Sequence, residues 1–194
     1  MPQIESGTPD NPTVYRDLTI TEGARLSGIH DVIFVDANIS RKPIIVGSSC
    51  RRVVFKHCQF HDSDHWLVDI EAGDLETLEH GDCGIQDSEL TDCSDIVTCQ
   101  IGGVGNFIEH CHIHDDAGRG IQLAGCDNQV RDNELVNLCT KSDDIGAIYL
   151  GNKNGSQGGH LVIGNTIHGI VGKPGFRLVH AIYGDDHTSN CTFK

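Results

Sequence analysis

Two short runs near the end of the chain combine adjacent carboxylates with a tyrosine. The first is Asp143-Asp144-Ile145-Gly146-Ala147-Ile148-Tyr149, and the second is His180-Ala181-Ile182-Tyr183-Gly184-Asp185-Asp186. Glycosidic cleavage needs two carboxyl groups, one that protonates the leaving oxygen and one that attacks or activates water. Tyrosine rings offer an apolar face with a polar tip, which suits a sugar. We predict Asp144, Asp185 and Asp186 as catalytic residues and Tyr149, Tyr183 and His180 as substrate-binding residues. The alternative is that these aspartates only form turns.

A third candidate segment is a strand, a tight turn and a second strand. It reads His112-Ile113-His114-Asp115-Asp116-Ala117-Gly118-Arg119-Gly120-Ile121-Gln122-Leu123. We expect Asp115, Asp116 and Arg119 to project at the turn, and we predict Asp116, Arg119 and Gln122 as further substrate-binding residues. Ordinary turn chemistry, in which Asp and Gly satisfy the backbone, is the competing interpretation.

Histidines and acidic residues alternate along one predicted face. Asp36, His57, Asp87, His110 and Asp132 form one column, and Asn38, Gln59, Glu89, His112 and Glu134 form the next. The simplest interpretation is a solvated face with weak charge pairs. The alternative is a site for a divalent cation (Ca or Zn) at His110 and His112, completed by carboxylates from the neighbouring coils.

These residues belong to a repeated pattern, apolar-x-x-small-x-apolar. It occurs at Phe34–Ile39, Phe55–Phe60, Ile85–Leu90, Ile108–Ile113, Val130–Leu135 and Val162–Ile167. Successive copies lie 21 to 32 residues apart, the longer spacings being one coil plus an excursion. A second short strand follows each copy, and glycines mark the turns. A β-sandwich would not repeat the motif at this regular spacing, and the Leu/Asn signature of leucine-rich repeats is absent.

The pattern predicts an all-β fold, a right-handed parallel β-helix of about 6–7 coils with about 22 residues each. Residues 1–28 are interpreted as an N-terminal cap or irregular first coil, and residues 29–194 as the solenoid. The first and last apolar positions of each copy should form two buried ladders. Asn133 and Asn165 should turn inward and hydrogen-bond stacked backbone and each other. We also expect a homo-oligomer, paired through an uncapped solenoid end.

The composition and charge of the chain restrict the kinds of partner that it can bind. The formal charge of −14 over 194 residues argues against nucleic acid, and against an acidic polysaccharide unless a cation bridges the contact. No apolar run is long enough for a membrane span, and the start shows no secretory signal. The nine cysteines lack a C-x-x-C pair, so we expect mostly free, buried thiols. That usage favours a reducing location, cytoplasmic or virus-encoded.

Residues 104–190 resemble bacterial right-handed β-helix proteins of the pectate-lyase-like superfamily. The resemblance rests on the run from Asn133 to Gly151, with its Gly-Ala-Ile-Tyr strand, and on Gly164-Asn165-Thr166-Ile167-His168 followed by Ala181-Ile182-Tyr183-x-Asp185-Asp186. The nearest type is the β-helix glycoside hydrolases of family 141, which include fucosidase- and xylanase-type enzymes. The resemblance implies a carbohydrate-active enzyme with Asp144, Asp185 and Asp186 at its groove.

Three functions remain open at this stage. The leading hypothesis is a glycoside hydrolase acting on a polysaccharide or oligosaccharide. The second is a polysaccharide lyase or epimerase, with Lys153, Arg119 or His114 as the base. The third is a non-catalytic solenoid that binds a glycan or a partner, or assembles as a spike-like module.

Overall fold

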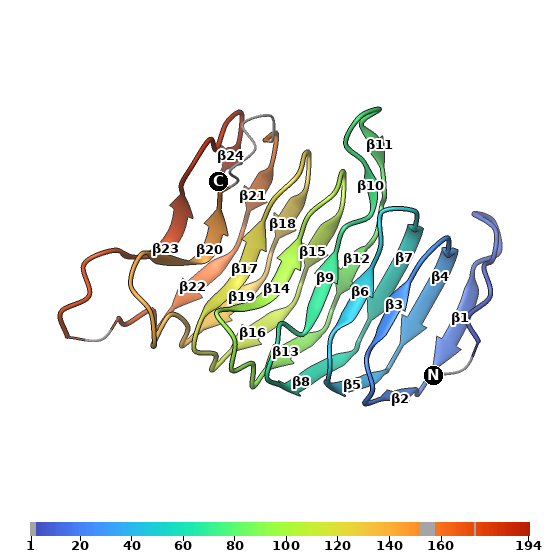
Figure 1. Ribbon diagram of the computed structural model, residues 1–194, viewed down its shortest axis with the longest axis horizontal. Helices are drawn as coiled ribbons and strands as arrows, with labels where there is room; N and C mark the ends of the chain where they lie inside the picture. Colours follow the sequence, from blue (N-terminus) through green and yellow to red (C-terminus); the bar gives the residue numbers. More distant parts are fainter. Residues whose placement is uncertain (1–2, 152–157, 173) are drawn as a thin grey trace.

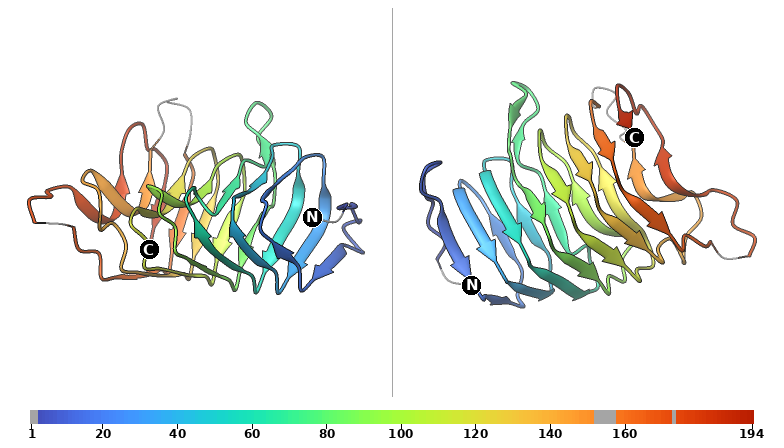
Figure 2. Two further views of the ribbon diagram at one scale, coloured as in Figure 1. Left: turned by 60° about the horizontal axis from the view of Figure 1, so that its bottom comes forward. Right: turned by 180° about the vertical axis from the view of Figure 1, so that it is seen from behind.

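Each coil of the protein contributes one strand to each of three parallel sheets. The computed structural model describes residues 3–151, 158–172 and 174–194. The sheets contain eight, seven and seven strands, and the coils stack in a row along the long axis (Figures 1 and 2). This arrangement confirms the right-handed parallel β-helix expected from the repeat. All strands in the described residues belong to these sheets except one short hairpin.

The first sheet holds the strand that opens each coil. Its members are β1 (Thr13–Arg16), β4 (His30–Val35), β7 (Arg51–Lys56), β12 (Gly84–Gln86), β15 (Phe107–Glu109), β18 (Gln129–Arg131), β21 (Leu161–Ile163) and β24 (Thr192–Phe193). Phe34, Phe55, Ile85, Ile108, Val130 and Val162 pair in register across it, as the repeat predicts.

The second sheet follows after a tight turn. Its members are β2 (Thr19–Ile20), β5 (Asn38–Arg41), β8 (Gln59–Ser63), β13 (Glu89–Thr91), β16 (His112–His114), β19 (Glu134–Val136) and β22 (Thr166–His168). Ile39, Phe60, Leu90, Ile113, Leu135 and Ile167 form its inward ladder, again as predicted.

The third sheet completes the coil. Its members are β3 (Ala24–Leu26), β6 (Ile44–Val46), β9 (Val68–Ile70), β14 (Val97–Ile101), β17 (Arg119–Leu123), β20 (Ile145–Leu150) and β23 (Val179–Gly184). A hairpin of β10 (Gly73–Asp74) and β11 (Glu79–His80) projects beyond this sheet (Figure 1). The first coil, β1 to β3, already pairs in register with the second.

The apolar-x-x-small-x-apolar motif is not one strand, as its sequence suggests, but two strands joined by a turn. The residue before the small position has a positive φ in five of the copies: Asp36, His57, Asp87, His110 and Asp132, at 50° to 55°. Asp and His tolerate this left-handed conformation better than most residues. Each coil therefore has three strands rather than the two predicted, and the Asp–His column is a stack of turns.

Polar side chains line two inner corners of the solenoid. The Asn133 amide donates to the Asn165 side-chain oxygen at 2.9 Å and to the Ile108 carbonyl at 3.0 Å, as expected for stacked asparagines. A second ladder, not predicted, joins Asn106 and Asn128, whose side-chain oxygen accepts the Asn106 backbone N–H at 2.7 Å. Buried polar groups satisfied in this way fix one register for the coils.

Sulfur fills much of the remaining core. Cys50, Cys58, Cys83, Cys93, Cys99, Cys111 and Cys139 are buried free thiols, which confirms the expected role of cysteine as a small apolar residue. Burial raises the pKa of Cys83 and Cys111 to about 12, so these thiols stay protonated. The described residues include no helix of the length and apolarity that a bilayer crossing requires.

Candidate functional site

The outward-facing row of the third sheet gathers polar and aromatic side chains. Strand pairing aligns Asp69, Gln100, Gln122, Tyr149 and Tyr183 on successive strands from β9 to β23. Neighbouring parallel strands lie about 4.8 Å apart, so this row extends over roughly 19 Å. A row of this kind can contact several units of an extended chain.

Tyr149 interacts with several neighbouring side chains in this row. Its hydroxyl donates a hydrogen bond to Asp185 Oδ2 at 2.5 Å. The Arg119 guanidinium lies over the Tyr149 ring, 3.6 Å from the ring centroid, and donates to Gln122 Oε1 at 2.8 Å. Burial and the Asp185 carboxylate raise the pKa of Tyr149 to about 12. The same hydrogen bond lowers the pKa of Asp185, which is therefore ionised at neutral pH.

Tyr183 reaches in the opposite direction. Its hydroxyl donates to Asp144 Oδ1 at 2.9 Å, and the His180 ring lies 4.7 Å from the Tyr183 ring. The two tyrosines pair in register, as predicted, but their rings meet edge to face at 81° with centroids 5.4 Å apart. Because each hydroxyl is bound to a different carboxylate, the rings cross instead of lying parallel.

The two tyrosine–carboxylate pairs lie at opposite ends of the strands. Asp144 immediately precedes β20, whereas Asp185 immediately follows β23, and each strand has six residues. Six strand residues extend the backbone by roughly 20 Å, so the two aspartates approach the tyrosine pair from opposite ends of the strands. Their carboxylates are linked through the Tyr183 and Tyr149 side chains rather than by a direct contact. The carboxylate next to Asp185 is that of Asp186, the adjacent residue.

An open groove of about 430 Å³ lies beside Tyr149. It is lined by Gln100, Arg119, Gln122, Ala124, Tyr149, Gly151 and Asp186. The Arg119 Nε is buried and has no hydrogen-bond partner among the residues described. A guanidinium group carries five N–H donors, so Arg119 can still offer donors of its terminal nitrogens to a ligand in the groove. Arg119, Gln122, Tyr149 and Asp186, four of the predicted site residues, thus line one groove.

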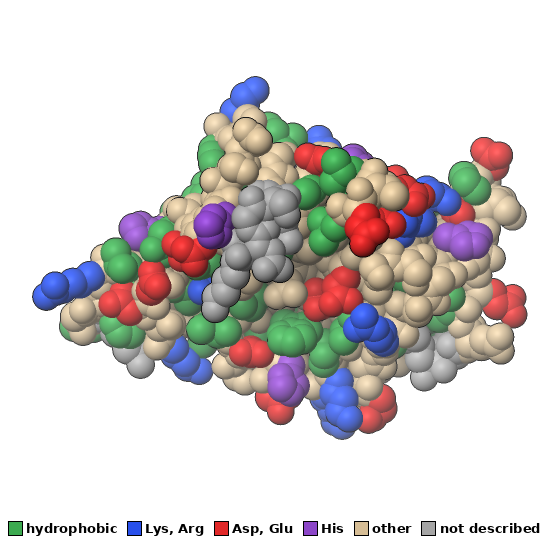
Figure 3. All heavy atoms as spheres, turned by 45° about the horizontal axis from the view of Figure 1, so that its top comes forward, with side chains coloured by type: hydrophobic (Ala, Val, Ile, Leu, Met, Phe, Trp, Pro, Cys, Tyr) green, Lys and Arg blue, Asp and Glu red, His purple; other side chains and the backbone are tan. Residues whose placement is uncertain are grey.

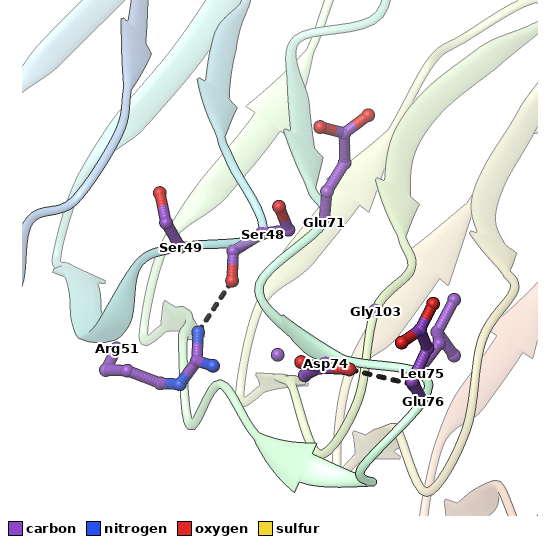
Figure 4. A pocket seen from close by; sticks show the side chains of 9 residues that line it. Ser48, Ser49, Arg51, Glu71, Asp74, Leu75, Glu76 and Gly103 are labelled. Atoms are coloured by element: carbon purple, nitrogen blue, oxygen red, sulfur yellow. Dashed lines mark hydrogen bonds between the residues drawn. The ribbon is translucent and has the colours of Figure 1, made fainter.

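A second, larger hollow of about 800 Å³ lies at the same end of the third-sheet strands. Its lining includes Ser48, Arg51, Glu71, Asp74 and Gly103, and Figure 4 shows Arg51 hydrogen-bonded to the Ser48 carbonyl. The hairpin β10–β11 contributes one of its walls. In Figure 3 acidic, basic and histidine side chains are interspersed on this side of the molecule rather than gathered in one charged patch.

Two aspartates on or near the third sheet are buried. Asp69 is 5% exposed, and burial with the neighbouring Glu71 charge raises its pKa to about 6. Asp116 does not project at its turn as expected. It is 1% exposed, accepts hydrogen bonds from the Cys93 N–H and the Thr98 hydroxyl, and so fixes the path of the backbone. Burial raises the pKa of Asp116 to about 6.

The histidine-rich face belongs to the second sheet and its turns. His110 lies in the stack of turns, with Asp87 and Asp132 at 3.7 and 3.8 Å. His112 does not share a metal-sized cluster with His110. It groups with His114 and Glu89, whose ligand atoms all lie within 4.8 Å of one another. Lys153, a candidate base, lies outside the described residues.

Comparison with solved structures identifies the fold. The chain aligns with the A-module of a mannuronan C-5 epimerase from Azotobacter vinelandii at a TM-score of 0.64 and 12% identity, covering 94% of this chain and 55% of that one. It also aligns with a glycosyl hydrolase candidate from Parabacteroides merdae at 0.55 and 10%, covering 93% of each chain. The chain thus spans about half of the epimerase module. Neither a family model nor a curated protein sequence matches the chain. The shared fold is a parallel β-helix.

Two polar residues of the outward row carry no clear sequence signal, because their strands lack an acidic pair. Gln100 lines the groove, and Asp69 pairs beside it but is buried. Aligning Ile96–Ile101 with Gly120–Leu123 would have placed Gln100 beside Gln122. Glu89 is one of the neighbouring-coil carboxylates that the metal hypothesis includes, whereas His114 was not expected as a ligand. The pair His112-x-His114 on one strand is nevertheless a clear signal, because side chains two apart share a face.

Proposed function

We propose that this protein is a carbohydrate-active enzyme that processes a polysaccharide or oligosaccharide lying along the outer row of the third sheet. The principal support is the contact between the Tyr149 hydroxyl and Asp185 beneath Arg119, at the edge of an open groove. A protonated phenol beside an ionised carboxylate provides an acid and a base at one point. The amides of Gln100 and Gln122 suit the hydroxyl groups of neighbouring sugar units.

Hydrolysis of a glycosidic bond is the reaction we place first. Asp185 is ionised and can attack the anomeric carbon or remove a proton from water. The glycosidic C–O bond breaks, and the leaving oxygen takes a proton from Asp186 or Tyr149. Asp144 accepts the hydrogen bond of the Tyr183 hydroxyl, and we assign it to holding Tyr183. The overall charge of −14 favours a neutral glycan.

Elimination or epimerisation at a uronic acid is the second candidate, favoured by Arg119. Its guanidinium group lines the groove and could bind the carboxylate of the sugar, which would acidify the neighbouring C–H. Asp185 would remove that proton. In elimination the leaving oxygen would be protonated by Tyr149. In epimerisation the Tyr149 hydroxyl would instead donate its proton to the other face of the same carbon. The fold is shared with a mannuronan epimerase module, which is compatible with this chemistry at the level of fold alone.

Product analysis distinguishes these reactions. Purified protein is incubated with neutral glycans and with polyuronates. Reducing ends without ultraviolet absorbance indicate hydrolysis, unsaturated ends that absorb indicate elimination, and altered uronate NMR signals without cleavage indicate epimerisation. We expect Asp185→Asn to abolish turnover and Asp10→Asn, an exposed aspartate before the first coil, to leave it unchanged. Saturable glycan binding without turnover of any substrate would instead establish the non-catalytic binding solenoid.

A further inference from the structure

We propose that Glu89, His112 and His114 form a binding site for a divalent transition-metal ion of the zinc class. The three side chains come from adjacent strands of the second sheet, β13 and β16, which lie side by side in Figure 1. Their ligand atoms all lie within 4.8 Å of one another. The site is on a different sheet from the groove, so it is independent of the proposed carbohydrate chemistry.

Strand geometry explains why these three residues converge. His112 and His114 are two residues apart on β16 and therefore project from the same face. Their rings stack, with centroids 4.2 Å apart and planes inclined by 27°. Glu89 pairs directly opposite His112 across β13, and its Oε1 lies 3.0 Å from His114 Nε2. Ligand atoms around zinc, each bonded at about 2.0–2.2 Å, are closer together than 4.8 Å, so small side-chain rotations suffice.

The surroundings of His114 match the outer shell of a metal-bound histidine. Its Nδ1 is hydrogen-bonded to Asp115 Oδ2 at 2.8 Å, which leaves Nε2 as the atom that faces Glu89. Asp115 is itself held by the Asn137 amide at 2.9 Å. Metal-bound histidines generally donate their other ring N–H to a carboxylate, which fixes the tautomer and the ring orientation. The His114 side chain is only 18% exposed, so its orientation is restricted.

The donor set identifies the class of ion. Two imidazole nitrogens and a carboxylate oxygen suit zinc, copper or nickel, whereas calcium takes six to eight oxygens. Glu134 Oε2 lies 3.8 Å from His112 Nε2 and can supply a fourth ligand or leave that position to water. The carboxylates of Glu89, Glu134 and Asp115 together favour a dication over an anion.

The protein contains a matched control. His61 occupies the position of His114 on β8, two strands away in the same sheet. Its Nδ1 binds Asp62 at 2.8 Å, as His114 binds Asp115, but its Nε2 faces the uncharged Asn38 at 3.1 Å. The residue at the position of His112 is Gln59. His61 therefore reproduces the local histidine–aspartate pair without the two other ligands.

The test titrates untagged, chelator-treated protein with Zn²⁺ in a calorimeter and with Co²⁺ in a spectrophotometer. We expect one saturable Zn²⁺ equivalent, cobalt d–d bands without thiolate charge-transfer bands, loss of binding in His112→Asn/His114→Asn, and wild-type binding in His61→Asn. Asp115→Asn should weaken binding by about 10- to 100-fold while every ligand remains. Circular dichroism checks that each variant is folded.

Three results would overturn the proposal. The first is that the folded wild type binds no saturable equivalent of metal. The second is that the double variant still binds metal, and the third is that thiolate bands place the cobalt on a cysteine. An equal loss of affinity in His61→Asn would likewise show that no particular pair of histidines is responsible. None of these results bears on turnover in the third-sheet groove, so the metal site and the proposed function can fail separately.

Discussion

Removal of the Asn106 side chain should markedly lower the denaturant concentration at which the solenoid unfolds. Asn106 is fully buried. Its Oδ1 accepts the Cys83 N–H at 3.1 Å, and its Nδ2 donates to the carbonyls of Ala72 at 2.7 Å and Gly102 at 2.9 Å. One side chain therefore connects three backbone groups, on neighbouring coils and within its own.

The expected loss can be worked out group by group for Asn106→Ala. The Cys83 N–H has no other acceptor among the described contacts, and an orphaned buried donor costs about 1–3 kcal/mol. The Ala72 carbonyl keeps the Val104 N–H at 2.9 Å, so it adds little. The Gly102 carbonyl loses its amide partner and adds about 1 kcal/mol. The sum is about 2–4 kcal/mol, a large part of the 5–15 kcal/mol typical of a domain.

Urea unfolding followed by circular dichroism measures this loss, and hydrogen exchange at the Cys83 amide locates it. The control is Asn38→Ala, because the Asn38 side chain is partly exposed and, among the described residues, hydrogen-bonds only to Gln59 and His61. That variant should change stability by less than about 0.5 kcal/mol. This reasoning would be refuted if Asn106→Ala were as stable as Asn38→Ala. It would also be refuted if the exchange rate of the Cys83 amide did not change.

Three further predictions concern other parts of the molecule. Burial raises the pKa of Asp116 to about 6, above its unfolded value, so the contribution of Asp116 to stability should be fully present below about pH 4 and be lost as the pH rises through 6. Asp69, whose pKa is also raised to about 6, should add a slope of the same sign. In urea titrations Asp116→Asn should reduce the loss of stability between pH 4 and 6 by about 2 kcal/mol, and an unchanged slope would exclude Asp116 as a source. Gly103→Ala should lower the free energy of unfolding by well over the roughly 1–2 kcal/mol expected for Gly28→Ala. Both glycines have a positive φ (60° and 65°), but only the new methyl group at residue 103 would clash, 1.9 Å from the Ala72 carbonyl oxygen. Equal melting temperatures of the two variants would contradict this. Tyr149→Phe should lower kcat by about 10²–10⁴ with little change in KM, and an unaltered kcat would remove Tyr149 from proton transfer.

The solenoid could be predicted because its ladders repeat. Each copy of the motif places Phe, Ile, Leu or Val at the same two positions, and register-specific pairing makes those positions columns. The third strand was missed, yet the sequence contained a clue. Phe34 and Ala37 are three apart and both face inward, which a strand that alternates every two residues does not allow. A turn at Asp36, with its φ of 55°, resolves the conflict.

The candidate site could be predicted only in part because its geometry depends on where strands begin and end. Register alone placed Tyr149 beside Tyr183. The sequence does not show that each tyrosine hydroxyl binds a different carboxylate, Tyr149 to Asp185 and Tyr183 to Asp144. Likewise, Asp115 and Asp116 are chemically identical, but one lies beside His114 at the surface and the other is buried against Thr98.

The position of a bound sugar tests the proposed function most directly. A crystal structure of the Asp185→Asn variant is determined with the oligosaccharide that the wild type turns over, or, without turnover, with the one that binds most tightly. The account predicts a sugar unit beside Arg119 and Tyr149, within reach of residue 185, with neighbouring units along Gln122 and Gln100. A sugar bound at the second sheet, or in the hairpin hollow alone, would contradict it.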